Sequence, residues 1–192
     1  MKKIIFVLLI LFFLPMNVYA YERIEVKLKT CIDGDTARFI MNNKEIKLRF
    51  LAIDTPEVTP SKQEPYGKEA KNFTCDKLTN ANKIEIEFDK NSSKKDKYNR
   101  YLAWVFYDNN LLQADLIKQG YAKVAYIYGD YKYTYILNDL EENAKKNKIG
   151  IYSSENYNEI NENNNKKSLN NILKNLYANI YEFFSKILQE IY

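Results

Sequence analysis

Hydrophobic and polar residues alternate in two short stretches of the chain, which is typical of half-buried β-strands, and three other stretches next to predicted turns are expected to be strands as well. In the first stretch Ile24, Val26 and Leu28 alternate with charged residues. The expected strands cover residues 24–28, 37–41, 45–53, 84–88 and 100–107. Asn42 and Asn43 separate the second strand from the third. Because asparagine tolerates positive φ, this pair predicts a tight hairpin.

Apolar residues at helical spacing mark three other stretches of the same region. The expected helices cover residues 66–78, 114–118 and 135–148. Ala70, Phe73, Thr74 and Leu78 would form the inward face of the first helix, and Gly120 is a typical C-cap residue for the second. Five strands interspersed with helices suit a small barrel.

The two ends of the chain differ from this region in composition. Residues 1–20 combine Lys2 and Lys3 with an apolar run and a small-residue ending, the pattern of a cleaved signal peptide that directs export. Residues 154–167 are rich in Asn, Glu and Lys and are expected to form a solvated linker. Residues 168–192 carry apolar residues at helical spacing and predict an amphipathic helix.

These assignments leave residues 21–153 as one domain, and about 130 residues can bury a single adequate core. An uncleaved anchor is the alternative interpretation of residues 1–20. The amphipathic helix at 168–192 also has two interpretations. It would pack on the domain or self-associate, or it would attach the protein to a membrane surface.

The net charge and the absence of histidine limit the kinds of binding and catalysis that can be inferred for the chain. Its 29 basic and 25 acidic side chains give a net charge of +4. Loss of Lys2 and Lys3 leaves 27 basic side chains against 25 acidic ones, or +2, so bulk charge does not predict nucleic-acid binding. The absence of histidine excludes Ser-His-Asp hydrolysis, His-pair ribonuclease chemistry and His-based zinc sites. A hydrolase built from this chain must use carboxylates, Arg, Lys and Tyr, with or without a hard metal ion.

Acidic residues gather at two predicted turns. Asp33 and Asp35 share one turn, and Asp54 and Glu57 lie where Pro56 ends a strand. Carboxylates on neighbouring turns can share one hard cation, although two turns of solvated acids are the simpler interpretation.

Arg49 lies five residues before Asp54 on the same predicted strand. Strand alternation would place these two side chains on opposite faces unless a bulge intervenes. The sequence also leaves open whether Cys31 and Cys75, the two cysteines of the chain, form a disulfide or remain separate thiols. Export would permit a disulfide.

Together with later stretches, these motifs resemble the staphylococcal-nuclease-like (thermonuclease) family. The matching segments are residues 32–36, 49–57, 66–70, 84–90, 96–100 and 116–126. The resemblance covers residues 21–153 and implies an α+β fold, a five-stranded OB-fold β-barrel with three helices. The predicted C-terminal amphipathic helix would be added to that fold.

The resemblance also implies a role for each candidate site residue. Asp35, Asp54 and the carbonyl of Thr55 would hold a Ca²⁺ ion, with Asp33 close by and acting through water. Calcium is therefore the expected cofactor, and DNA and RNA are the expected substrates.

Three further residues would carry out the cleavage itself. Arg49 and Arg100 would bind the phosphate oxygens, because a guanidinium is a planar, permanently charged donor. Glu57 would orient and deprotonate the attacking water. The residues expected to contact the nucleotide are Lys97, Tyr98, Tyr126 and Tyr128.

The chain departs from the family pattern at two places. Asn99 stands where the family often has glycine, and because asparagine tolerates positive φ we expect the turn to persist. The polar loop at 58–65 is shorter than in the best-known member, which affects substrate preference rather than catalysis.

The resemblance implies an exported, Ca²⁺-dependent endonuclease that cleaves DNA and RNA with low sequence specificity and leaves 3′-phosphate ends. The alternative is a catalytically inactive nucleic-acid- or protein-binding module of the same fold. Such modules generally lack the acidic and arginine residues that are all present here. A third interpretation is an envelope-attached protein whose C-terminal helix is the main functional part.

Overall fold

The computed structural model describes residues 22–59, 61–153, 166, 169–177 and 180. The predicted signal peptide, nearly all of the predicted linker and most of the predicted C-terminal helix lie outside these residues.

Residues 22–59 and 61–153, as the structure describes them, form ten strands and four helical segments. The strands are β1 (Arg23–Cys31), β2 (Thr36–Met41), β3 (Lys44–Phe50), β4 (Ile53–Asp54), β5 (Val58–Thr59), β6 (Lys62–Gln63), β7 (Ile84–Glu87), β8 (Tyr101–Tyr107), β9 (Asn110–Leu111) and β10 (Lys123–Val124). The helices are α2 (Gly67–Asn80), α3 (Leu112–Lys118) and α4 (Thr134–Lys146), followed by the short 3₁₀ helix η1 (Gly150–Tyr152).

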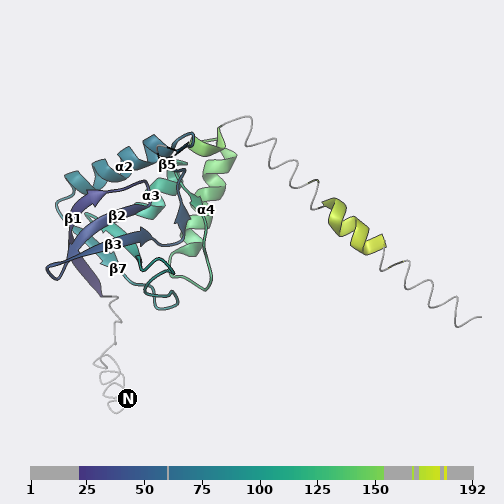
Figure 1. Cartoon of the computed structure of the whole chain (residues 1–192). Coiled ribbons are helices and arrows are strands. Elements are labelled where there is room, and N and C mark those ends of the chain that lie inside the picture. The colour runs from purple at the N-terminus through teal and green to yellow at the C-terminus, as the bar shows by residue number, and fades with distance from the viewer. Residues whose placement is uncertain (1–21, 60, 154–165, 167–168, 178–179, 181–192) are drawn as a thin grey trace, which may run out of the picture.

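Five of the strands close into a barrel. The main sheet has the order β3-β2-β1-β7-β8-β9, with antiparallel neighbours throughout. A parallel pairing of β3 with β8 joins its two sides. Strands β1, β2, β3, β7 and β8 therefore form the five-stranded barrel that the sequence predicted, with three helices packed around it (Figure 1).

The barrel interior is filled by large apolar side chains, which strand alternation directs inward. Phe39, Leu48, Ile86 and Trp104 are fully buried in this core. Helix α2 packs on β1, while α3 packs on β8 and α4. Leu78 of α2 is buried with the core, and Ala70 and Thr74 of the same helix are also fully buried, as the helical spacing predicted.

The third strand ends earlier than the sequence predicted. The expected strand ran to residue 53, but β3 ends at Phe50, and a turn at Leu51 and Ala52 separates it from β4. Ala52 has a φ of 62°. Hydrogen bonds hold the turn on both sides: Leu51 N–H donates to Ala103 O (3.0 Å), and Ala52 O accepts from Ala125 N–H (3.1 Å). Tertiary contacts thus impose a conformation that alanine does not favour by itself.

The predicted polar loop at 58–65 also contains regular structure. Strands β5 and β6 pair there as a small antiparallel hairpin, with Val58 opposite Gln63. The hairpin at Asn42 and Asn43 forms as predicted, with φ values of 49° and 60°.

The described part of the C-terminal segment is helical at 169–177. Its apolar side chains are exposed, among them Leu169, Ile172 and Leu176. Among the described residues, none of the helices is both long and apolar enough to cross a membrane.

Candidate active site

A cleft of about 690 Å³ opens beside the barrel, and it gathers every candidate site residue named from the sequence. The residues concerned are Asp33, Asp35, Arg49, Asp54, Thr55, Glu57, Lys97, Tyr98, Arg100, Tyr126 and Tyr128. They come from four parts of the chain: the loop between β1 and β2, the segment from β3 to β5, the loop before β8 and the loop after β10.

The turn after β1 holds Asp35 in a network of hydrogen bonds. Its backbone N–H donates to Asp33 Oδ1 (3.1 Å). Its side chain accepts from the backbone N–H of Thr55 (2.9 Å) and from the hydroxyl of Thr36 (3.0 Å). Gly34 leaves no room for a side chain, because an added Cβ would lie 2.9 Å from Ala70 Cβ. The turn therefore packs tightly against both α2 and Thr55.

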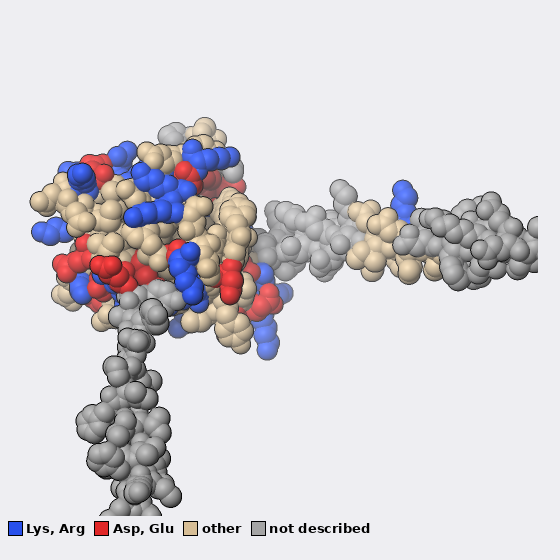
Figure 2. All heavy atoms as spheres, turned by 90° about the horizontal axis from the view of Figure 1, so that it is seen from below, with Lys and Arg blue, Asp and Glu red and all other residues tan. Residues whose placement is uncertain are grey.

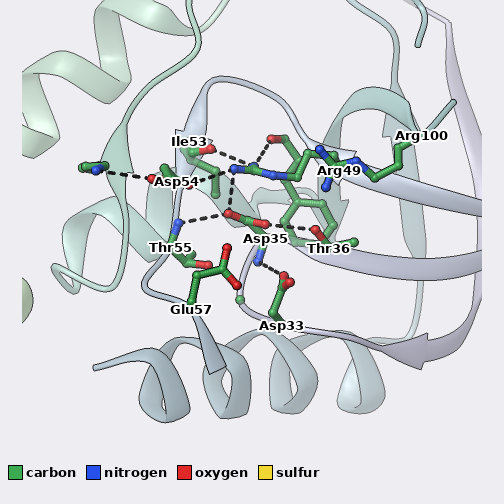
Figure 3. Close-up of polar contacts among 12 residues, drawn as sticks. Asp33, Asp35, Thr36, Arg49, Ile53, Asp54, Thr55, Glu57 and Arg100 are labelled. Atoms are coloured by element: carbon green, nitrogen blue, oxygen red, sulfur yellow. Dashed lines mark hydrogen bonds and ion pairs between the residues drawn. The ribbon is translucent and has the colours of Figure 1, made fainter. Parts of the chain in front are cut away.

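Arg49 faces the same carboxylates, contrary to simple strand alternation. The turn at residues 51–52 brings Asp54 back toward Arg49, so that Arg49 Nη2 lies 2.9 Å from Asp35 Oδ2 and 3.1 Å from Asp54 Oδ1 (Figure 3). Arg49 Nη1 donates to the carbonyls of Phe50 (3.0 Å) and Ile53 (2.7 Å). Backbone acceptors thus hold one half of the guanidinium while the other half faces the acids.

Asp35 is a deeply buried acid, with only 4% of the residue exposed. Burial raises its pKa from 3.8 to about 7, although the Arg49 guanidinium opposes this shift. Since burial penalises the charged form, the single positive charge of Arg49 does not fully compensate the carboxylate.

The oxygen atoms at this site fit a hard cation. Ca²⁺ binds six to eight oxygen ligands, and carboxylates, backbone carbonyls and water all serve. The described residues contain no cluster of three or more His, Cys, Asp or Glu side chains placed to hold a metal. Asp35 and Asp54 would therefore supply the charged ligands, and the Thr55 carbonyl and water would complete the coordination.

Lys123 is a neighbour of the acids that the sequence did not single out. The pairing of β10 with β4 places it opposite Asp54, and its Nζ lies 3.3 Å from Asp54 Oδ2. Lys123 thus pairs with Oδ2 of Asp54, while Arg49 pairs with Oδ1 of the same carboxylate.

Glu57 lies on an exposed loop that hydrogen bonds between Glu57 and Glu64 hold in place. The N–H of Glu57 donates to Glu64 Oε2 (2.8 Å), and the N–H of Glu64 donates back to the carbonyl of Glu57 (3.0 Å). Gly67 lies against the same carbonyl, which an added Cβ would approach to 2.8 Å. Figure 3 shows the Glu57 carboxyl group on the same side of Arg49 as Asp33 and Asp35.

Arg100 reaches the cleft from a tight turn. Asp96 Oδ2 accepts from Arg100 Nε (2.6 Å), and Asp96 Oδ1 accepts from the backbone N–H groups of Tyr98 and Arg100 (both 2.9 Å). Partial burial raises the pKa of Asp96, but these hydrogen bonds outweigh it and lower the pKa below its ordinary value. Asn99 has a φ of 61°, so the predicted turn with asparagine in place of glycine is confirmed.

Exposed tyrosines stand beside both guanidinium groups. Tyr98 is 68% exposed and Tyr128 84% exposed. The Cζ of Arg100 lies 5.4 Å from the ring centre of Tyr98, and that of Arg49 lies 5.5 Å from the ring centre of Tyr126. In proteins that bind single strands, exposed aromatic rings next to positively charged groups are surfaces on which bases stack without sequence preference.

A buried carboxylate ties together the loops that carry these tyrosines. Asp89 accepts hydrogen bonds from Trp104 Nε1 (2.9 Å) and from the backbone N–H groups of Asn91 (2.9 Å) and Lys132 (2.8 Å). Asn91 Nδ2 in turn donates to the carbonyl of Asp130 (2.5 Å). This arrangement could not be predicted from the sequence, because two of the three partners of Asp89, Trp104 and Lys132, are distant in the chain.

Outside the cleft the surface charge is mixed. Figure 2 shows acidic and basic side chains interspersed over the face in view. This mixture agrees with the small net charge, so any affinity for nucleic acid has to come from the local site.

Known proteins are similar in sequence to this chain over most of the region described. Endonuclease YncB of Bacillus subtilis is 39% identical over 137 residues, which cover 70% of this chain and 64% of that protein. The SPbeta prophage-derived endonuclease YokF of the same organism is 37% identical over 139 residues, covering 71% of this chain and 46% of that protein. The match thus spans less than two thirds of either protein. Thermonuclease of Staphylococcus hyicus is 38% identical over 125 residues, covering 64% of this chain and 72% of that protein.

A sequence model of one family also matches the chain. It is described as staphylococcal nuclease homologue and matches residues 47–154. This range includes Arg49, Asp54, Glu57 and Arg100, whereas Asp35 lies before it. The chain belongs to the staphylococcal nuclease family.

Proposed function

We propose that this protein is a Ca²⁺-dependent endonuclease that hydrolyses DNA and RNA with low sequence specificity and leaves 3′-phosphate ends. The observation that carries the proposal is the single cleft shared by two carboxylates, two guanidinium groups and an exposed glutamate. Relatives named as endonucleases and thermonucleases support the reaction class.

Phosphodiester hydrolysis requires that the negative charge of the phosphate be neutralised. Bound Ca²⁺ would supply a Lewis acid at Asp35 and Asp54. Arg49 and Arg100 would donate hydrogen bonds to the phosphate oxygens. For Arg49 this requires exchanging a carboxylate partner for the phosphate, while its two carbonyl contacts keep the guanidinium in place.

The attacking water needs a base, and Glu57 is the side chain proposed for that role. It is exposed at the cleft, while its backbone is fixed by the reciprocal contacts with Glu64. Because the backbone of this loop is fixed, the Glu57 carboxylate can accept a proton from water while the loop stays in place. A positioned base contributes roughly 10²–10⁴-fold to the rate.

Low sequence specificity follows from the kind of contacts that the cleft offers. Tyr98, Tyr126 and Tyr128 would stack against bases, and stacking does not distinguish one base strongly from another. Lys97 lies beside Tyr98, with Nζ 5.0 Å from the ring centre, and would contact a phosphate of the bound strand.

Purified protein and single-stranded DNA test the proposal directly. We expect cleavage with Ca²⁺, no cleavage with a chelator, and fragments whose 3′ ends carry phosphate. RNA should be cleaved under the same conditions. Nucleotide binding without cleavage in the presence of Ca²⁺ would instead identify an inactive binding module.

Export through residues 1–20 is part of the same proposal. We expect the intact mass of the protein recovered outside the cytoplasm to correspond to a chain that begins at Tyr21. A retained Met1 would contradict cleavage of the signal.

A further inference from the structure

The two cysteines lie near each other in the folded protein. Cys31 is the last residue of β1, and Cys75 lies in the middle of α2, the helix that packs on β1. Both are free, partly buried thiols, and Cys75 is close enough to Cys31 to help raise its pKa. The sequence had left open whether two cysteines so far apart would lie near each other.

The contact rests on firm packing of α2 against the end of β1. One residue before Cys75, the hydroxyl of Thr74 donates to the carbonyl of Gly34 (2.6 Å), within a buried environment. Gly34 itself fits closely against Ala70 of the same helix. These contacts hold the middle of α2, which carries Cys75, against the turn that follows Cys31.

We propose that Cys31 and Cys75 form an intramolecular disulfide when the protein meets a disulfide-containing oxidant, such as an oxidised thiol–disulfide oxidoreductase or glutathione disulfide. The thiolate of one cysteine attacks the oxidant and forms a mixed disulfide, releasing one thiol. The second cysteine attacks this mixed disulfide and releases the other thiol. Two electrons and two protons pass to the oxidant.

Cys31 is a weak nucleophile at neutral pH. Burial and the neighbouring Cys75 together raise the pKa of Cys31 to about 12. A thiol with so high a pKa forms little thiolate, which is the reactive species. We therefore expect Cys31 to react slowly at neutral pH.

The closed loop would contain the acidic half of the candidate site. It runs from residue 31 to residue 75 and includes Asp35, Arg49, Asp54 and Glu57. A cross-link across such a loop reduces the freedom of the unfolded chain, so the oxidised protein should be the more stable form.

Intact mass and thermal unfolding of the full chain test this inference. After equilibration with glutathione disulfide, the unreduced mass should be about 2 Da lower, because two thiol hydrogens are lost. Peptide mapping should join the peptides that contain Cys31 and Cys75. The unfolding midpoint of the oxidised protein should exceed that of the reduced protein by roughly 5–15 °C.

Single serine variants provide the matched controls. Cys31→Ser and Cys75→Ser should each show no difference in midpoint between oxidising and reducing conditions. Two alkylatable thiols remaining in the native wild-type protein after equilibration would overturn the inference, and so would a disulfide between two chains. These readouts do not depend on nuclease activity, so the inference and the proposed function fail separately.

Discussion

The two walls of the cleft are built in opposite ways. The acidic wall consists of Asp33, Asp35, Arg49, Asp54 and Thr55, and the aromatic wall consists of Lys97, Tyr98, Tyr126 and Tyr128. In the acidic wall Asp35 is 4% exposed and Arg49 8% exposed, and both make several hydrogen bonds. Tyr98 and Tyr128 in the aromatic wall expose most of their surface.

This difference indicates what each wall contributes. In the acidic wall, hydrogen bonds and ion pairs among Asp35, Arg49 and Thr55 hold most of the geometry before a ligand arrives. Binding of a phosphate would require only that Arg49 exchange one carboxylate partner. The aromatic wall lies on loops that hydrogen bonds to Asp89 hold together. Its exposed rings offer contact area for a flexible single strand of nucleic acid. Changes in the acidic wall should therefore reduce kcat and stability, and changes in the aromatic wall should raise KM.

Removing the base should have the largest effect on activity. We expect Glu57→Gln to lower kcat by roughly 10²–10⁴-fold, because the amide cannot accept the proton of water. Binding of a nucleotide and the unfolding midpoint should change little, since Glu57 is exposed. Single-turnover cleavage and calorimetric nucleotide binding provide the measurements. Activity close to that of the wild type would remove Glu57 from the reaction.

Substitution of either arginine should lower kcat by a similar factor, but the two variants should differ in the free energy of unfolding. Arg49→Gln and Arg100→Gln should each lower kcat by roughly 10²–10³-fold, the effect of losing one preorganised donor. Arg49→Gln should also lower the free energy of unfolding by about 3 kcal/mol, because it leaves the buried Asp35 without its ion pair. Arg100 pairs with a more exposed acid, so its loss should cost about 1 kcal/mol or less.

Kinetics and urea unfolding of both arginine variants provide the comparison. Equal losses of stability would show that the acidic wall is no more rigidly built than the turn that carries Arg100.

A change in the aromatic wall should give the smallest and most specific effect. Tyr98→Ala should raise KM for single-stranded DNA by roughly tenfold, since stacking contributes about 1–3 kcal/mol per base. The value of kcat and the unfolding midpoint should stay close to those of the wild type. Tyr98→Phe, which keeps the ring, serves as the control in steady-state kinetics. A fall in kcat with unchanged KM would place Tyr98 in the reaction itself.

The sequence predicted the parts of this structure that local residue chemistry controls. The asparagine hairpin and the turn at Asn99 follow from the tolerance of asparagine for positive φ, and both formed as expected. Two of the five barrel strands followed from alternation, and the other three from their position beside predicted turns. The family resemblance named the residues that the cleft gathers, and their individual roles remain predictions.

What the sequence did not predict depends on partners distant in the chain. Ala52 adopts a positive φ because Ala103 and Ala125 bind the backbone on both sides of it, and nothing about alanine indicates this. Alternation would place Glu87 in solvent, yet it is buried, because Lys132 and Tyr133 bind its carboxylate. Buried charged groups of this kind need partners that only the folded chain supplies.

A crystal structure with Ca²⁺ and a nucleotide bisphosphate tests the central claim most directly. We expect the ion within about 2.3–2.6 Å of oxygen atoms from Asp35 and Asp54. One phosphate should lie between the ion and the guanidinium groups of Arg49 and Arg100, with a water molecule bound to Glu57. A calcium ion held by other acids, or a phosphate bound away from both arginines, would contradict the assignment of this cleft as the active site.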